Sequence, residues 1–291
     1  MANKSPEPLA YSRLGQVGAR TPLVIAVPHA GRHYPPGMLA EARLPRNALE
    51  TIEDRHADLL VTDAVHAGAV AIVGRMARAF VDLNRDEREI DPAILAGGSA
   101  PGDVLLSAKA SGGLGVVPSR IAAGGAVWKR PLTQGAFEAR LALVHRPYHD
   151  AIGRALDEAV AVHGLAVLID CHSMPPIVGT GAGPDAGPRV VIGDRHGRSA
   201  GARFVGAATS AVRGAGVSVA HNHPYAGGHT LDRHGRPRAG RHAMQIEFDR
   251  TLYLDAALRE PGAGLAAVQR LVATIADALL AEAQSQALAA E

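Results

Sequence analysis

Short apolar runs alternate along the chain with longer segments in which apolar residues recur every three or four positions. The runs Leu23–Val27 and 165–169 are unbroken and rich in branched side chains, as in strands buried on both faces of a parallel sheet. Further strands are expected at 69–73, 77–83, 190–193, 217–220 and 243–250. The helical spacing predicts helices at 44–67, 133–162, 199–212 and 264–288.

This alternation of strands and helices predicts an α/β fold with three layers, in which helices cover both faces of a mainly parallel, mixed central sheet. No linker or internal repeat interrupts the pattern, so a single domain over residues 1–291 is expected. The segment 90–128 is rich in Gly and Pro and has little periodicity. We expect a functional loop there, which could close over a site as a lid.

The amino-acid composition argues against nucleic acid and membranes as binding partners. Lys plus Arg is 30 and Asp plus Glu is 28, a net charge of +2, so no strong field favours nucleic acid or a membrane. No stretch reaches the roughly twenty apolar residues of a membrane span. The N-terminus has no signal-peptide pattern, and the single cysteine, Cys171, fits a reducing compartment. We therefore expect a cytoplasmic protein with a small-molecule substrate, and its oligomeric state stays open.

Two buried runs end in a histidine, His29 after the first and His172 after the second. Because ligands bind beyond the carboxyl ends of parallel strands, these imidazoles indicate a metal site. Catalytic zinc commonly takes three protein ligands and leaves one position for water. The third ligand would be a carboxylate, Glu53 or Asp54. Cys171 points to the opposite face of the strand from His172, which argues against thiolate ligation.

Three further residues have side chains suited to amide hydrolysis. Glu247 has apolar neighbours in a predicted strand and could act as the general base; the alternative is an ordinary strand glutamate that faces solvent. Asn84 and Arg85 follow a predicted strand and could bind a substrate carboxylate, because a guanidinium pairs with it at two points. The alternative for Arg85 is a structural ion pair with Asp82 or Asp86.

Seven short motifs occur in the order seen in the N-formylglutamate amidohydrolase family, also called formylglutamate deformylases. Each motif is weak alone, but seven in order form a specific signal, and the resemblance runs from about residue 21 to residue 255. The motifs are Val-Pro-His-Ala-Gly (27–31), Asp-Arg-His-Ala-Asp (54–58), Val-Asp-Leu-Asn-Arg-Asp (81–86), Arg-Pro-Tyr-His (146–149), Asp-Cys-His-Ser (170–173), Asn-His-Pro-Tyr-Ala-Gly-Gly (222–228) and Gln-Ile-Glu-Phe (245–248).

The family resembles the zinc carboxypeptidases and the aspartoacylase-type deacylases, which implies a phosphorylase/hydrolase-like α/β fold and one zinc per chain, with other divalent metals possible. By this resemblance the ligands are His29, Asp54 and His172, with Glu53 as the alternative to Asp54. Glu247 would be the base, and Asn84 with Arg85 would hold a substrate carboxylate.

Glutamate has two carboxylates, so a second cation is expected, and the candidates are Arg120 and Arg146. Gly228 in the double glycine either permits close approach of substrate or belongs to a tight turn. Four further histidines, His149, His223, His229 and His242, are candidate proton relays or oxyanion donors, and the alternative for each is a structural role.

The sequence therefore predicts a zinc-dependent amidohydrolase that cleaves an N-acyl amino acid. The leading substrate is N-formyl-L-glutamate, as in the last step of histidine degradation. One alternative is a carboxypeptidase- or amidase-like zinc hydrolase that acts on a peptide or cell-wall fragment. Another is a module that binds metal or carboxylate without catalysis.

Overall fold

The computed structural model describes residues 10–16, 18–97, 104–122, 124–177, 179 and 187–289. The chain divides into two compact units. The first unit comprises residues 1–12, 28–53 and 73–150, and the second comprises residues 13–27, 54–72 and 151–291. The organisation of residues 1–291 as a single domain stays a prediction.

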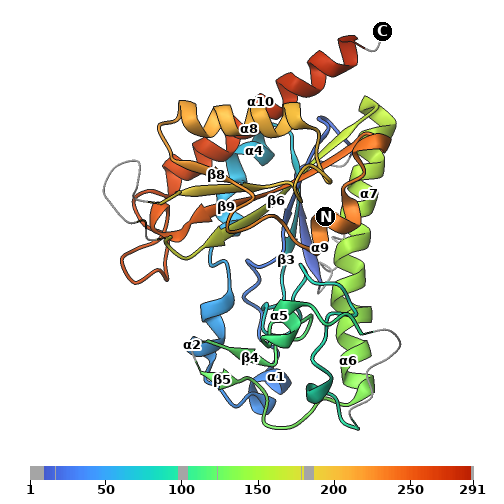
Figure 1. The fold of residues 1–291 in the computed structure, drawn as a ribbon, viewed down its shortest axis with the longest axis vertical. Helices are drawn as coiled ribbons and strands as arrows, with labels where there is room; N and C mark the ends of the chain where they lie inside the picture. The colour runs from blue at the N-terminus through green and yellow to red at the C-terminus, as the bar shows by residue number, and fades with distance from the viewer. Residues whose placement is uncertain are drawn as a thin grey trace, which may run out of the picture. The chain divides into compact units, whose positions relative to one another are not determined.

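A seven-stranded sheet forms the centre of the second unit (Figure 1). Residues 11–12 of β1 and 73–74 of β3 are the parts of its strands that belong to the first unit. Its order is β1-β3-β2-β6-β9-β7-β8. The pairs β2/β6, β6/β9 and β7/β8 are parallel, and β7/β9 is antiparallel. The strands are β1 (Tyr11–Leu14), β2 (Leu23–Val27), β3 (Val70–Gly74), β6 (Ala166–Met174), β7 (Val190–Gly193), β8 (Val219–His221) and β9 (Arg241–Asp249).

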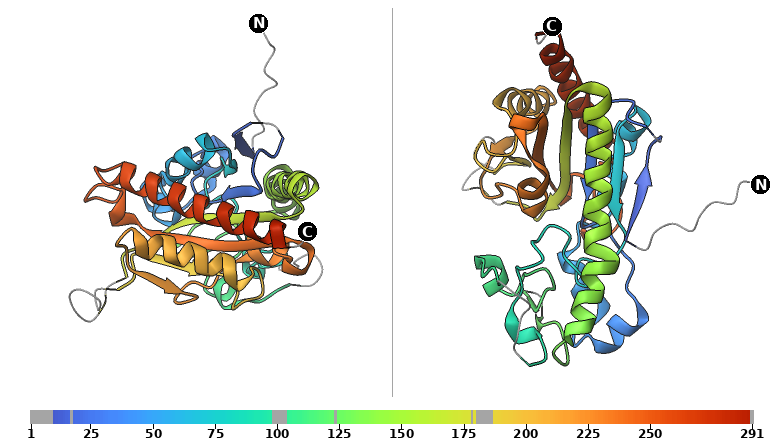
Figure 2. Two further views of the ribbon diagram at one scale, coloured as in Figure 1. Left: turned by 90° about the horizontal axis from the view of Figure 1, so that it is seen from above. Right: turned by 90° about the vertical axis from the view of Figure 1, so that its right-hand side faces the viewer.

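Every residue of β2, β6 and β7 is buried, as the unbroken apolar runs predicted. The helices α3, α4 and α8 all pack against α10, and this group contacts the strands β2, β6, β7 and β8. Figure 2 shows α8 and α10 running side by side. The mainly parallel, mixed sheet with flanking helices confirms the predicted α/β class. The helices that lie wholly within this unit are α3 (Ala57–Leu60), α4 (Thr62–His66), α8 (Ala202–Gly214), α9 (His229–His234) and α10 (Leu265–Ala289).

The prediction of one continuous helix over 44–67 is wrong. The segment forms α2 (Arg46–Leu49), a short 3-10 turn (Glu50–Ile52) and then α3 and α4. The backbone of Glu53 is extended, with ψ 154°, and His56 has the left-handed φ of 59°, so helical hydrogen bonding cannot pass through them. Asp54 therefore lies in a break between helices, and its side chain does not belong to the surface of a helix.

The strand predicted at 77–83 is also absent: these residues form turns and irregular backbone. Ala77, Ala79, Val81 and Leu83 are nevertheless almost completely buried. The apolar run thus correctly predicted that these residues are buried but wrongly predicted a strand. An apolar run alone does not distinguish a strand from a buried loop.

The first unit otherwise contains short elements: α1 (Pro36–Glu41), a 3-10 turn (Pro92–Ile94), α5 (Ala108–Ser111), the antiparallel pair β4 (Arg120–Ile121) and β5 (Gly125–Ala126), and α6 (Gln134–Arg140). The segment 90–128 accordingly has little regular structure, as predicted, although 98–103 and 123 lie outside the described residues. Its closure as a lid stays a prediction.

One long helical segment continues from α6 through a π-helical turn (Leu141–His145) into α7 (Arg146–His163). It confirms the helix predicted at 133–162. The π turn inserts an extra residue into the helix and so changes the direction in which nearby side chains point. Among the described residues, no helix has both the length and the apolar character needed to cross a bilayer.

Candidate metal centre and substrate site

The strands β6 and β9 place a histidine and a glutamate side by side. His172 and Glu247 are register partners in this parallel pair, and Asp170 and Gln245 are partners two residues earlier. Since side chains two residues apart share a face of a strand, these four project to the same side of the sheet. Glu247 is only 8% exposed and accepts a hydrogen bond of 2.9 Å from Nε2 of Gln245. It is therefore not a solvent-facing strand residue.

Carboxylates lie at both ring nitrogens of His172. Nδ1 is 2.9 Å from Oδ2 of Asp54, and Nε2 is 3.0 Å from Oδ2 of Asp170. The other oxygen of Asp54 accepts from Nη2 of Arg250 at 3.1 Å. A histidine that donates one ring N–H to a carboxylate keeps a fixed tautomer and orientation, and this is how metal-binding histidines are commonly supported.

Negative charge is concentrated around His172. Burial alone would lower the pKa of its ring, but Asp170, Asp54 and Glu247 outweigh that effect and hold the pKa well above its usual range. Burial and the same three carboxylates raise the pKa of the Cys171 thiol, which keeps it protonated and unsuited to metal ligation. The second unit thus provides an anionic environment and oxygen and nitrogen donors that fit a divalent cation.

In the first unit, His29 has an equivalent support. Its Nε2 lies 2.7 Å from Oδ1 of Asp82, and both side chains are almost completely buried. Burial of Asp82 opposes ionisation, yet Arg78 and His29 hold the pKa of this carboxyl well below its usual range. A neutral His29 that donates from Nε2 to an ionised Asp82 carries its lone pair on Nδ1, the form suited to a metal ligand.

Arg85 and Asn84 lie in a buried turn of the first unit and are 5% and 4% exposed. Nε of Arg85 donates to the carbonyl of Leu114 at 3.0 Å, and Nη1 donates to the carbonyl of Asn84 at 2.7 Å. Within the described part of the chain, no carboxylate forms an ion pair with Arg85. The charge of Arg85 nevertheless contributes to the lowered pKa of Asp82, so these two groups interact electrostatically. The role of Arg85 in binding a substrate carboxylate stays a prediction.

The remaining predicted residues have different surroundings. Glu53 lies in the first unit and accepts a hydrogen bond from the hydroxyl of Tyr34. Arg120 is exposed, and its Nη2 donates to the carbonyl of Ser111 at 3.0 Å. Arg146 pairs with Glu87 at 2.8 Å and with Glu138, which satisfies much of its charge. Gly228 precedes α9 with an ordinary extended backbone, φ −127°, so its conformation does not require glycine.

The neighbouring Gly227 does require glycine. Its φ is 102°, and a Cβ atom there would lie 2.4 Å from Cδ2 of Leu231. This supports a tight turn at the double glycine.

The sequence reasoning missed three supporting residues. Asp170 was expected at the end of the same strand as His172, and its supporting role could have been inferred because residues two apart on a strand share a face. Asp82, considered only as a partner of Arg85, instead supports His29. No local pattern marks Arg250, which contacts Asp54 from 196 residues away and Ser173 at 3.2 Å.

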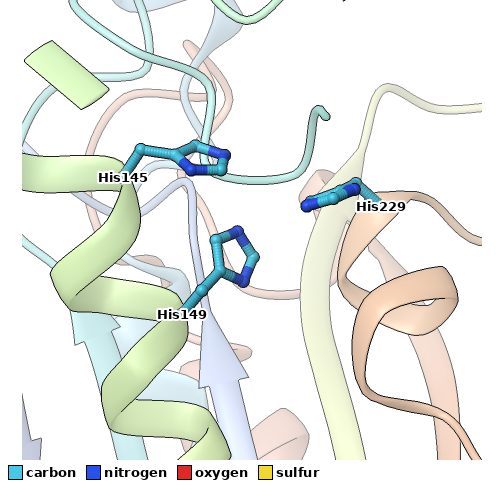
Figure 3. A group of neighbouring side chains, drawn as sticks. All are labelled: His145, His149 and His229. Carbon is cyan, nitrogen blue, oxygen red and sulfur yellow. The ribbon is translucent and has the colours of Figure 1, made fainter. Parts of the chain in front are cut away.

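Four further histidines differ in their surroundings. His145 and His149 lie on successive turns of one helical segment, whereas His229 begins α9 in the second unit (Figure 3). His149 donates from Nε2 to the carbonyl of Leu83 at 2.8 Å. Nδ1 of His242 accepts from the backbone N–H of Gly201 at 3.1 Å. Both contacts are of a structural kind.

This chain is similar to N-formylglutamate deformylases of two Pseudomonas species. An N-formylglutamate deformylase of Pseudomonas putida is 28% identical over 246 residues, which cover 81% of this chain and 83% of that protein. One of Pseudomonas aeruginosa is 30% identical over 247 residues with the same coverage.

Two solved structures are similar. The crystal structure of N-formylglutamate amidohydrolase from Ralstonia eutropha JMP134 has a TM-score of 0.84 at 29% identity and covers 95% of this chain and 98% of its own. The gene product Atu2144 of Agrobacterium tumefaciens has a TM-score of 0.65 at 19% identity, covering 94% and 96%, and it shares the fold. Residues 21–254 match the family model described as N-formylglutamate amidohydrolase. The chain therefore belongs to this family of hydrolases that act on an amide bond, as the order of its motifs predicted.

Proposed function

We propose that this protein hydrolyses N-formyl-L-glutamate to formate and L-glutamate with one bound divalent metal, zinc in the first place. The observation that carries the proposal is the register pairing of Glu247 with His172. It sets a buried carboxylate directly beside a histidine that already contacts Asp54. A proton acceptor next to a metal-ligand pair is what metal-assisted amide hydrolysis needs.

The proposed ligands are His29, Asp54 and His172. Asp54 and His172 form a contact of 2.9 Å in an environment dominated by carboxylates, which suits a cation. His29 follows the last residue of β2 by two positions, and β2 pairs with β6 through Ala26 and Asp170. Two residues span at most about 7 Å, so the chain itself keeps His29 close to the carboxyl end of that strand pair.

A metal at these ligands supplies a Lewis acid that polarises the formyl oxygen and makes water a better nucleophile. Glu247 takes a proton from the attacking water and passes it to the leaving nitrogen of glutamate. The C–N bond breaks as the water oxygen bonds to the formyl carbon, which yields formate and L-glutamate. Asp82 holds the imidazole of His29 through its Nε2 atom, and the carboxylate of Asp170 lies 3.0 Å from Nε2 of His172, where it favours the orientation of that ring.

Arg85 and Asn84 bind one carboxylate of the substrate. The guanidinium is buried, is fixed by two backbone carbonyls, and makes no ion pair within the described residues, so it can offer charge-assisted hydrogen bonds. For the second carboxylate, Arg120 is favoured over Arg146. Arg146 already forms ion pairs with Glu87 and Glu138, whereas Arg120 donates to a neutral carbonyl.

The test is formate release from N-formyl-L-glutamate by zinc-loaded protein, with chelator-stripped protein as control. Metal-dependent release at a rate well above the stripped control supports the proposal. Zinc bound at one per chain without formate release would exclude this substrate. N-acetyl-L-glutamate and short peptides, assayed in parallel, separate a deformylase from a hydrolase of larger amides.

A further inference from the structure

The backbone around the proposed carboxylate-binding residues is held by two histidines outside the proposed catalytic set. Nε2 of His149 lies 2.8 Å from the carbonyl oxygen of Leu83, and Nε2 of His145 lies 2.8 Å from that of Arg85. The carbonyl between them, that of Asn84, accepts from Nη1 of Arg85. Side chains therefore satisfy three consecutive buried carbonyls of a segment that has no regular secondary structure.

Both imidazoles are almost completely buried, at 0% and 1% exposure. A carbonyl oxygen only accepts hydrogen bonds, so each Nε2 carries the hydrogen. The backbone N–H of Asn84 donates to Oδ1 of Asp82 at 2.9 Å. The segment is thus fixed by three side-chain donors and one side-chain acceptor rather than by hydrogen bonds of its own secondary structure.

The helix geometry explains how one element makes both contacts. His145 ends the π turn and His149 follows four residues later, which gives a rise of about 6 Å along the axis and places both on one face. Figure 3 shows the two rings on successive turns, and their centroids are 4.6 Å apart. Tyr148 packs edge-on against the ring of His149 at 5.4 Å and restricts its rotation.

We propose that His145 and His149 are positioning residues that orient Asn84 and Arg85 toward a substrate carboxylate by donating from Nε2 to the carbonyls of Arg85 and Leu83. This proposal rests on the proposed function, because it assumes that Asn84 and Arg85 bind the substrate. Neither histidine transfers a proton in it. Their effect reaches the substrate through the direction of the guanidinium, and small misplacements of such groups can lower catalytic efficiency by up to about 100-fold.

The experiment compares substitutions that remove the donor with substitutions that keep it. H145F and H149F retain a ring but lose the Nε2–H. H145Q and H149Q place an amide N–H near the position of Nε2. His163 provides a matched control, because it lies on α7 and its Nε2 is 2.9 Å from the carbonyl of Ala19, away from the segment 83–85. Thermal unfolding and metal content are measured for every variant.

We expect H145F and H149F to raise KM for N-formyl-L-glutamate about 10-fold or more with a smaller change in kcat, and the glutamine variants to recover most of the loss. H163F should leave KM unchanged. In an R85A background, H149F should add little, because the residue it orients is gone. A loss in kcat alone, an equal effect of H163F, or full additivity with R85A would overturn the positioning role.

A failure of the proposed function gives a different result. If the unmodified protein releases no formate, the same variants are tested by calorimetric binding of N-formyl-L-glutamate. Binding that H149F weakens and H149Q restores supports the positioning role without the reaction. Absence of binding to the unmodified protein, or binding that R85A and H149F leave unchanged, would overturn it.

Discussion

His172 and Glu247 are register partners on the parallel strands β6 and β9, and their side chains project to the same face of the sheet. Glu247 is one of the carboxylates that raise the pKa of His172 against the opposing effect of burial. A shift of either strand by one residue would turn one side chain to the other face. The relation is therefore fixed by the buried apolar residues of two central strands.

Glu247→Gln tests the proposed base. The substitution keeps the shape and one hydrogen-bond acceptor but cannot take a proton from water, so kcat should fall by about 10²- to 10⁴-fold. Zinc content, measured by atomic emission, should stay at one per chain. The control is Glu282→Gln, which makes the same change on α10. Retention of kcat in the Glu247 variant would favour a module that binds metal without catalysis.

Asp54→Asn tests the carboxylate ligand. The amide oxygen can still accept from Arg250, but the negative charge that faces Nδ1 of His172 is lost. We expect metal affinity, measured by competition with a chromophoric chelator, to fall at least 100-fold. Zinc should also raise the unfolding temperature of the unmodified protein and have little effect on this variant. Asp63→Asn on α4 is the control, and equal affinities in the two variants would remove Asp54 from the ligand set.

Asp170→Asn tests the support of His172. Asp170 is fully buried and lies 3.0 Å from Nε2, where a neutral amide would support the ring less strongly than a carboxylate. Loss of such a partner typically weakens metal binding by about 10- to 100-fold. The effect should be smaller than that of Asp54→Asn, and the exposed Asp277→Asn should show none. A lower unfolding temperature without a change in metal affinity would show that Asp170 contributes to stability alone.

The parts of the site carried by buried strands could be predicted from the sequence. The apolar runs before His29 and His172 became β2 and β6, and the run around Glu247 became β9. Continuous burial leaves a strong signal, and residues that end such strands meet at one edge of the sheet. The family resemblance added the choice of Asp54 over Glu53.

The remainder depended on contacts that local patterns do not encode. The break at 53–56 depends on the conformations of Glu53 and His56, although the apolar spacing continues through it. Segment 77–83 is buried without being a strand because other parts of the chain satisfy its backbone; the carbonyl of Leu83, for example, is bonded to His149. The contact of Arg250 with Asp54 joins residues 196 positions apart, for which a single sequence contains no periodic signal.

Acid sensitivity should depend in part on His234, the last residue of α9. Burial, followed by the charges of Arg233 and His229, lowers its pKa to about 3, against 6.5 in an unfolded chain. Between these values the unfolded chain binds a proton that the folded chain does not, so stability falls as the pH falls from about 6.5 toward 3. His234→Gln removes this titration. Denaturant unfolding at a series of pH values measures this effect. Between pH 6.5 and 4.5, the free energy of unfolding of the unmodified protein should fall by about 2 kcal/mol more than that of the variant. Parallel curves for the two proteins would show that His234 titrates alike in both states.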